Sequence, residues 1–190
     1  MITLLISSFA LATQSTATLC PIMGHPAVAS GGFSDYAGLR FAYCCPGCKD
    51  AFEKAPLATF EKSVKDKKTV AFSLFDPVSR RRLDEKDAKG GFVDFESVRY
   101  FFATSDNKAT FEKEPKKYAA RPKQEVLYCI VMDHGLGGYS GAGSYVDHAD
   151  VRYYFCCPNC SAEFEKAPAT FVASAKSKVT SPKVANPKSG

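Results

Sequence analysis

The sequence of 190 residues contains no tryptophan, only three histidines and only three methionines. It has no hydrophobic run of the about 20 residues that a membrane-spanning helix needs, and no glycine-rich phosphate-binding loop. No histidine is placed as a base beside a nucleophilic side chain, so hydrolytic or nucleophilic catalysis has little support. We therefore expect a non-enzymatic protein without a stable membrane span.

A large basic surface is also lacking, although the formal net charge is +5. Four lysines and no acidic residue fall within residues 176–190, so this segment accounts for most of the net charge. The remaining chain has no basic excess of the kind that nucleic-acid-binding proteins show, and we predict no nucleic-acid partner. The Lys/Ser/Pro-rich composition of residues 176–190 predicts a disordered tail.

The chain begins with an apolar run of signal-peptide length over residues 1–12, followed by the polar stretch 13–18. Small residues suited to cleavage occur at 10–12 and 15–17, although no lysine or arginine precedes the run. We predict a signal peptide over residues 1–17 and a periplasmic or secreted protein. A buried N-terminal segment and a misassigned start codon are the alternatives.

Threefold internal similarity is the clearest organisational feature of the sequence. The segments 40–56 and 152–168 share their cysteines and the closing Phe-Glu-Lys-Ala-Pro, and segment 99–115 follows the same frame without cysteine. An aspartate stands five residues before the first arginine of each segment, and the pair is interpreted as structural: Asp35 with Arg40, Asp94 with Arg99, and Asp147 with Arg152.

Each repeat predicts a small α+β module. In the first repeat, residues 35–38 indicate a turn and the aromatic run 40–44 a strand. Pro46 fits a helix start, and Pro56 ends that helix. The predicted fold class is therefore α+β, with tandem modules that each consist of a short β-hairpin followed by a helix. The three modules are expected, in order and with charged linkers between them, at residues 18–62, 70–121 and 125–175.

The eight cysteines form two compact, matching clusters: Cys20, Cys44, Cys45 and Cys48 in the first repeat, and Cys129, Cys156, Cys157 and Cys160 in the third. Soft ions such as Cu(I) and Zn²⁺ prefer thiolates brought together from separate parts of a chain. Cys48 can share an ion with Cys44 or with Cys45, and neighbouring cysteines point in different directions, so only one of the two is expected as a principal ligand. Disulfide bonding, for example of Cys20 with Cys44 or Cys48, is the alternative.

Methionine and histidine recur at matching positions of the two outer repeats. Met23 and Met132 follow the first cysteine of their clusters by three residues, and His25 and His134 follow it by five. All four are candidate ligands. The alternatives are core packing for the methionines and a surface position for the histidines. His148 takes the place of an aromatic residue and is interpreted as a packing residue.

Several of these motifs resemble the YHS domain, which belongs with the TRASH-type treble-clef metal-binding modules. They are Cys20-Pro-Ile-Met-Gly, Asp-Tyr-x-Gly, Tyr-Cys-Cys-Pro-Gly-Cys and Phe-Glu-Lys-x-Pro. The resemblance covers about three quarters of the chain in three copies and implies treble-clef-like modules. Its pattern of one cysteine followed by Cys-x-x-x-Cys implies two ligand sets: Cys20, Cys44 and Cys48, and Cys129, Cys156 and Cys160.

The resemblance also implies heavy-metal sensing, trafficking or resistance, most commonly for copper. The middle copy departs from the pattern, because it has Asp76-Pro-Val-Ser79 at the first cysteine position and no downstream cysteines. It is therefore predicted not to bind metal. The third copy departs from the pattern in its longer loop over residues 135–143.

Together these features predict an exported heavy-metal-binding protein that captures or carries Cu(I) or Zn²⁺, with a metal donor or acceptor protein as a further partner. One alternative is a structural role, in which zinc or disulfides staple an interaction module. A second alternative is thiol–disulfide exchange through the Cys-x-x-Cys spacing of Cys45 with Cys48 and Cys157 with Cys160. No thioredoxin-like βαβ pattern surrounds these motifs, which argues against the second alternative.

Overall fold

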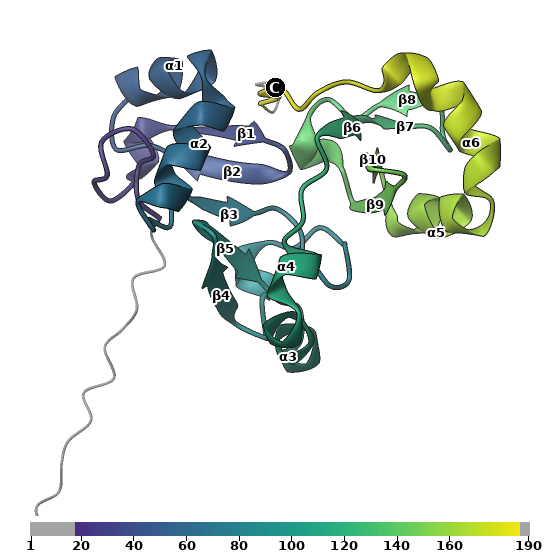
Figure 1. Cartoon of the computed structure of the whole chain (residues 1–190), viewed down its shortest axis with the longest axis horizontal. Helices are drawn as coiled ribbons and strands as arrows, with labels where there is room; N and C mark the ends of the chain where they lie inside the picture. The colour runs from purple at the N-terminus through teal and green to yellow at the C-terminus, as the bar shows by residue number, and fades with distance from the viewer. Residues whose placement is uncertain (1–17, 187–190) are drawn as a thin grey trace, which may run out of the picture.

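The computed structural model describes residues 18–186, so the predicted signal peptide lies outside the described residues. The fold is α+β, as predicted, with short strands and six α-helices in the described chain. The three repeats pack against one another (Figure 1). None of the helices in residues 18–186 combines the length and hydropathy needed to cross a membrane.

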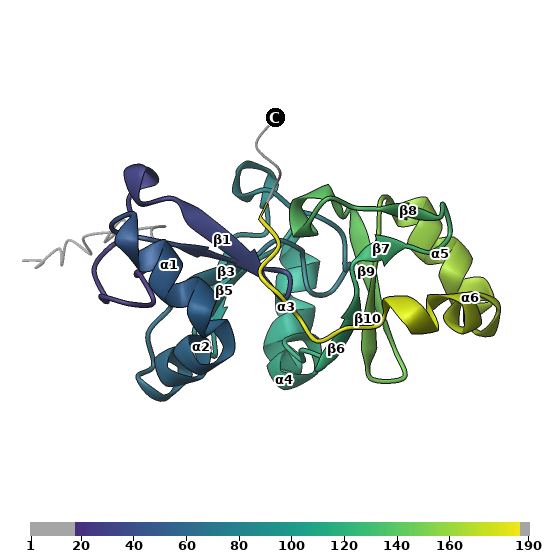
Figure 2. The same ribbon diagram turned by 90° about the horizontal axis from the view of Figure 1, so that it is seen from above.

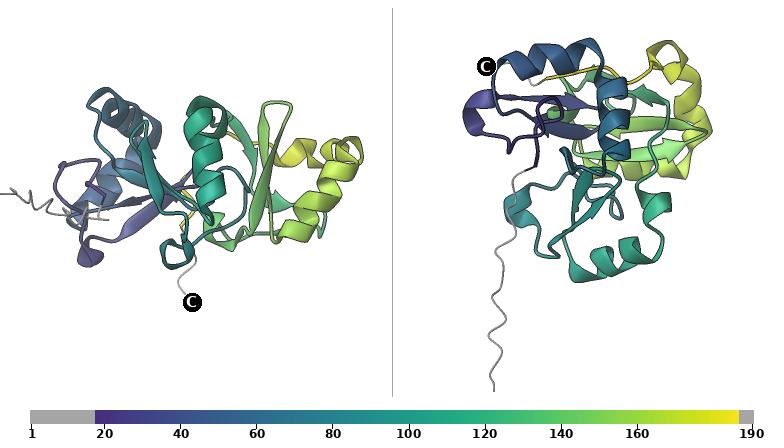
Figure 3. Two further views of the ribbon diagram at one scale, coloured as in Figure 1. Left: turned by 90° about the horizontal axis from the view of Figure 1, so that it is seen from below. Right: turned by 60° about the vertical axis from the view of Figure 1, so that its left-hand side comes forward.

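Each repeat contains a two-stranded hairpin followed by two helices. The hairpins are β1 (Phe33–Tyr36) with β2 (Leu39–Ala42), β4 (Phe92–Phe95) with β5 (Val98–Phe101), and β9 (Ser144–His148) with β10 (Val151–Phe155). The helices are α1 (Gly47–Lys54) and α2 (Pro56–Lys65), α3 (Ser105–Lys113) and α4 (Pro115–Tyr118), and α5 (Pro158–Lys166) and α6 (Pro168–Ala175). Helices α1, α3 and α6 lie at the outside of the molecule and α4 lies near its centre (Figure 1 and Figure 3).

Short strands and 3-10 helices complete the fold. The strands are β3 (Ala71–Ser73), β6 (Gln124–Val126), β7 (Tyr128–Cys129) and β8 (His134–Gly135). The 3-10 helices span Ala29–Gly31, Glu85–Asp87, Tyr139–Gly141 and Lys176–Lys178.

Each of the three hairpins contains a cross-strand ion pair between an aspartate and an arginine. Asp35 and Arg40 are directly opposite in the β1–β2 ladder, and Arg40 donates two hydrogen bonds to the Asp35 carboxylate at 2.7 and 2.9 Å. The Arg40 guanidinium also stacks 3.9 Å from the centre of the Phe33 ring. The other two repeats have the same bidentate pair and the same stacking, of Arg99 on Phe92 and of Arg152 on Tyr145. The pair therefore holds the hairpin together, as the sequence predicts.

A proline divides the helical part of each repeat. Ala55, which precedes Pro56, leaves the helical region at φ −149°, because the proline ring disfavours the α conformation in the residue before it. Pro56 then begins α2, where its missing N–H is not needed. The preceding helix packs a fully buried phenylalanine on its own hairpin, with Phe52 4.5 Å from Phe41 between ring centres. Aromatic contacts of this kind form the core of each repeat.

A shared sheet joins the first two repeats. Strand β3 pairs antiparallel with β2 and parallel with β5, giving a five-stranded sheet in the order β1-β2-β3-β5-β4. One hydrophobic core accordingly contains side chains of both repeats. In the third repeat, β6 pairs parallel with β10 as β3 pairs with β5. A second hydrophobic core lies in this repeat, and it also contains Leu74 and Phe75 from the middle repeat. The middle repeat thus connects the other two.

The C-terminal segment differs from the disordered tail that its composition predicts. Residues 179–186 run from α6 across β6 to β1, as Figure 2 shows, and link the third repeat to the first. Thr180 forms a β-bridge with Glu125, and Val184 forms one with Tyr36. Val179 and Val184 pack against the two cores. Backbone pairing to distant strands orders this segment, and composition alone does not reveal such pairing. We call residues 179–186 the strap.

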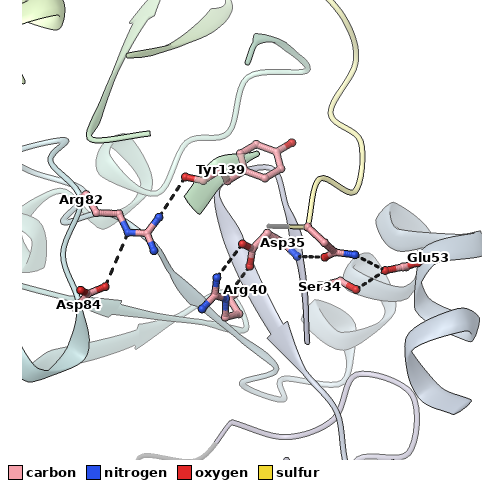
Figure 4. Close-up of polar contacts among 8 residues, drawn as sticks. Ser34, Asp35, Arg40, Glu53, Arg82, Asp84 and Tyr139 are labelled. Carbon is pink, nitrogen blue, oxygen red and sulfur yellow. Dashed lines mark hydrogen bonds and ion pairs between the residues drawn. The ribbon is translucent and has the colours of Figure 1, made fainter. Parts of the chain in front are cut away.

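Polar contacts fix the end of the strap on the first repeat. The Asp35 N–H donates to the Asn186 side chain at 3.1 Å, and the Asn186 amide donates to Glu53 at 2.9 Å. The Ser34 hydroxyl also donates to Glu53, so the strap and β1 share this α1 carboxylate (Figure 4). The strap therefore reaches the helix that carries Cys48.

A buried glutamate anchors the middle of the strap. Glu125 accepts a hydrogen bond from the Tyr139 hydroxyl, which also donates to the Lys183 carbonyl in the strap. Burial raises the pKa of Glu125 to about 7, against the opposing effects of the Tyr139 hydroxyl, Arg152 and the Lys183 N–H. The side chain is therefore partly protonated near neutral pH.

We expect the wild-type chain to lose stability as pH rises from about 4.5 to about 7, and we expect Glu125→Gln not to show this loss. The pKa of Glu125 in the folded chain lies above its ordinary 4.5, so the folded state binds more protons in this window, and the free energy of unfolding falls with rising pH. A pKa difference of this size corresponds to about 3 kcal/mol in the free energy of unfolding. Urea unfolding at the two ends of the window measures it, with the exposed Glu112→Gln as control. Equal pH dependence in wild type and Glu125→Gln would contradict the assignment.

Candidate metal centres

The first cysteine of each outer repeat lies at the base of a tight backbone turn. The Cys20 N–H donates to the His25 carbonyl at 2.7 Å, and the Gly24 N–H donates back to the Cys20 carbonyl at 2.8 Å. In the third repeat, Cys129 pairs with His134 in the β7–β8 hairpin. Both cysteines are fully buried, so the turn directs each sulfur into the protein.

The other two sulfurs come from the junction of strand and helix. Cys44 follows β2, and Cys48 lies in the first turn of α1, with their sulfurs 3.9 Å apart. Cys156 and Cys160 occupy the same positions after β10 and in α5, with their sulfurs 3.6 Å apart. Residues four apart at a helix start share one side, so each pair faces its turn cysteine.

Three of the four sulfurs in each outer repeat lie within 4.8 Å of one another. These groups are Cys20, Cys44 and Cys48 in the first repeat, and Cys129, Cys156 and Cys160 in the third. We call these groups the triads. An ion bound at about 2.3 Å from each thiolate holds its sulfurs about 3.7–4.0 Å apart, close to the 3.9 Å between Cys44 and Cys48 and the 3.6 Å between Cys156 and Cys160. Two members of each triad are buried and the third is half-buried. Each triad is therefore close enough to bind one metal ion.

Backbone N–H groups stabilise a thiolate at the turn cysteine. Burial acts to raise the pKa of Cys20, but the N–H groups of Met23, Cys44 and Ile22 outweigh it, and the pKa lies below its usual value. Burial also acts to raise the pKa of Cys129. The backbone N–H groups of Cys156 and Met132, together with the side chains of Cys156 and Cys160, outweigh burial and lower this pKa. The deprotonated form that binds metal is thus favoured at one position of each triad.

The helix cysteine holds its proton in the metal-free site. Its contact with Cys45, together with burial, raises the pKa of the Cys48 thiol. Burial is the largest cause that raises the pKa of Cys160, followed by the contact with Cys157. Metal binding at either triad must therefore displace this proton.

Cys45 and Cys157 lie beside the triads and are not members of them. Cys45 is exposed and Cys157 half-buried, and their sulfurs are 3.0 and 3.4 Å from those of Cys48 and Cys160. The structure thus places Cys44 and Cys156, and not their neighbours, in the triads. All eight cysteines are free thiols, since the sulfur separations far exceed the about 2.05 Å of a disulfide bond.

The candidate methionine and histidine ligands are at the surface. Met23 and Met132 are 56% and 60% exposed, and His25 and His134 are also exposed. Neither histidine joins a triad in the described chain, and His134 has its Nδ1 3.0 Å from the Gly135 carbonyl. Ligation by these four residues stays a prediction. His148 packs edge-on against Phe164, with ring centres 5.9 Å apart.

In the middle repeat, a carboxylate takes the position of the first cysteine. Asp76 stands 23 residues before Arg99, as Cys129 stands 23 residues before Arg152. Asp76 is fully buried. Its Oδ1 accepts hydrogen bonds from two N–H groups of its own turn, at 2.9 and 3.1 Å, from Val78 and Ser79. These donors correspond to two of the N–H groups that surround the sulfur in the first repeat, those of Ile22 and Met23.

The other oxygen of Asp76 connects the two remaining triad positions. Oδ2 accepts the Ala103 N–H at 2.9 Å and the Asn107 side-chain amide at 2.7 Å. Ala103 and Asn107 correspond to Cys44 and Cys48. A buried carboxylate and an amide therefore make, by hydrogen bonds, the connection that a metal ion would make in the outer repeats. Sequence reasoning missed this role of Asp76, although the identical spacing to the arginine signals it.

No family model, no curated protein and no solved structure matches this chain. Function is therefore inferred from the triads and the sequence motifs around them.

Proposed function

We propose that this protein binds a soft metal ion, Cu(I) or Zn²⁺, in each of its two triads and captures or carries it without catalysing a reaction. The observation that supports this most directly is the presence of two matching triads in the two outer repeats, each with two buried sulfurs. Thiolate ligands select soft ions over Mg²⁺ or Ca²⁺. The middle repeat supports the same conclusion, because its three triad positions are joined by hydrogen bonds where thiols are lacking.

The ligand number favours transport over a structural staple. Structural zinc sites are closed by four protein ligands. In the part of the chain that the structure describes, each triad offers three thiols with no histidine or carboxylate beside them, and the fourth thiol, of Cys45 or Cys157, contacts one triad sulfur but is not part of the group. Three thiolates suit Cu(I) and leave a zinc ion open to exchange. We therefore favour Cu(I), with Zn²⁺ as the alternative, and a metal donor or acceptor protein as the partner.

The membership and location that we propose come from the sequence. The motifs around Cys20 and Cys129 support a YHS domain of the TRASH type in three copies, the middle one without thiols. The apolar run over residues 1–12 supports export to the periplasm or beyond.

Elemental analysis tests the proposal. Protein purified under reducing conditions without chelator is expected to contain about two Cu(I) or Zn²⁺ ions per chain, since each triad binds one. Cys48→Ser and Cys160→Ser should each remove one ion, because each deletes a triad sulfur, and the double substitution should remove both. Lys49→Ala, beside Cys48 but outside the triad, is the control and should retain both ions. Full metal content in the double variant, or no metal and few free thiols in the wild type, would contradict the proposal.

A further inference from the structure

A fourth thiol lies immediately outside each triad. The sulfur of Cys45 is 3.0 Å from that of Cys48, and the sulfur of Cys157 is 3.4 Å from that of Cys160. Cys48 and Cys160 are themselves triad members, so one sulfur in each site contacts both the triad and the outer thiol. The same arrangement occurs in both outer repeats.

The middle repeat shows what this position does when no metal is bound. There the residue is Thr104, whose hydroxyl accepts the Asn107 N–H at 3.2 Å and caps α3. Threonine is a preferred N-cap, whereas a cysteine sulfur is only a weak acceptor. Cys45 and Cys157 occupy this position at the start of α1 and α5, where no side-chain cap hydrogen bond of the Thr104 kind is present, and both occur beside a triad. This pairing of outer thiol with triad indicates a role in handling the ion.

Access to the triads gives that role a physical reason. The turn cysteine Cys20 is 0% exposed and Cys48 is 3% exposed, while Cys45 is at the surface. An ion that arrives bound to a donor must keep ligands throughout its transfer, because a soft ion without thiolates is poorly stabilised. An exposed thiol such as Cys45, or the half-buried thiol of Cys157, meets this requirement through its contact with a buried ligand, since it can bind the ion before the donor has fully released it.

We propose that Cys45 and Cys157 are entry ligands, which take a soft metal ion from a donor thiolate complex and pass it to the triad through Cys48 and Cys160. The inference rests on the proposed function of the triads. It adds to that function the order in which the protein sulfurs bind and the thiolate chemistry of the donor.

The transfer is a series of ligand exchanges without change of oxidation state. The Cys45 sulfur forms a bond to the ion as one donor thiolate leaves, and the Cys45 proton goes to that thiolate. Cys48 then binds as the second donor thiolate departs with the Cys48 proton. The remaining triad sulfurs bind next, with any proton passing to water, and Cys45 leaves the ion and is protonated again. No disulfide forms and no electron is transferred.

The rate of metal uptake separates this role from permanent ligation. The probe is Cu(I) bound to glutathione, which is a thiolate donor, and uptake is followed by rapid gel filtration and copper analysis of the protein fraction. Cys45→Thr with Cys157→Thr installs the residue that caps α3 in the middle repeat, so the variant should fold at least as stably as the wild type. We expect it to bind two Cu(I) at equilibrium, as the wild type does, but to take them up more slowly by on the order of tenfold or more.

The adjacent cysteines provide the matched control. Cys44→Ser with Cys156→Ser should lower the equilibrium Cu(I) content, because these residues belong to the triads. An unchanged uptake rate in the Cys45→Thr, Cys157→Thr variant would overturn the entry role and leave the proposed function intact. Loss of bound Cu(I) in that variant would overturn it too, since Cys45 would then be a resident ligand. A wild-type chain that binds no Cu(I) would overturn both proposals.

Discussion

Asp76→Cys, Ala103→Cys and Asn107→Cys introduced together are expected to raise the metal content from about two ions per chain to about three. The middle repeat already has the backbone of a triad: a turn that surrounds position 76 with N–H donors, and a strand–helix junction that carries positions 103 and 107. Three thiols at these positions reproduce the arrangement in the third repeat, where the spacing to the arginine is identical. The middle repeat thus differs from the proposed metal sites in the side chains at these three positions.

Elemental analysis of the triple variant, purified in reductant, measures this directly. Asn107→Cys alone is the matched control and should leave the content at about two ions, because one thiol beside a carboxylate does not make a soft-metal site. A folded triple variant that still holds only two ions would show that the middle repeat differs from the outer two in backbone as well as in side chains.

Asp76→Ala is expected to lower the free energy of unfolding by about 3–5 kcal/mol. The carboxylate is fully buried and accepts four hydrogen bonds, which connect its own turn to the end of β5 and the start of α3. Alanine leaves these donors without an acceptor in the interior, and hydrogen bonds to a charged group are among the stronger ones. Because the middle repeat packs on both of the others, the loss should appear in the stability of the whole chain.

Urea unfolding of the metal-loaded protein measures the effect. Asp76→Asn keeps one acceptor oxygen but replaces the other with an NH2 group, which would face N–H donors and accept no hydrogen bond from them. An intermediate loss of about 1–3 kcal/mol is therefore expected. Asp84→Ala is the control, since this exposed carboxylate only faces Arg82 at 3.9 Å and should change stability by less than about 0.5 kcal/mol. A loss below about 1 kcal/mol in Asp76→Ala would mean that Asp76 does not replace the metal as a connection.

The contrast between middle and outer repeats explains why one unit does without metal. Modules of about 45 residues bury little core by themselves, so each needs an additional connection between turn and helix. The middle repeat obtains it from Asp76 with Asn107, and shares its sheet and cores with both neighbours. The outer repeats place thiols at the same positions. The triads that we propose as metal sites therefore lie where each outer repeat needs this connection, and metal binding there would stabilise the repeat.

Part of the site was predictable from the sequence because it depends on local repetition. The two cysteine clusters, their shared spacing and the lack of thiols in the middle repeat are visible without a structure. The choice between Cys44 and Cys45 was left open by spacing alone, because both stand close to Cys48 in the sequence. Side-chain direction at the end of β2 decides it, and the structure places Cys44 in the triad and Cys45 outside.

The sequence by itself determined the α+β class, the hairpin and first helix of each repeat and the Asp–Arg pair, because these follow from short-range patterns of aromatic residues, turns and prolines. The second helix of each repeat, which begins at the proline, was not predicted. Only the tertiary structure decided that β3 joins two repeats in one sheet, that the strap runs from α6 to β1, and that Asp76 connects its turn to Ala103 and Asn107 by hydrogen bonds. These features arise from contacts between residues far apart in the chain. Composition and periodicity describe neighbours along the chain, whereas strand pairing and buried hydrogen bonds are settled when the three repeats pack.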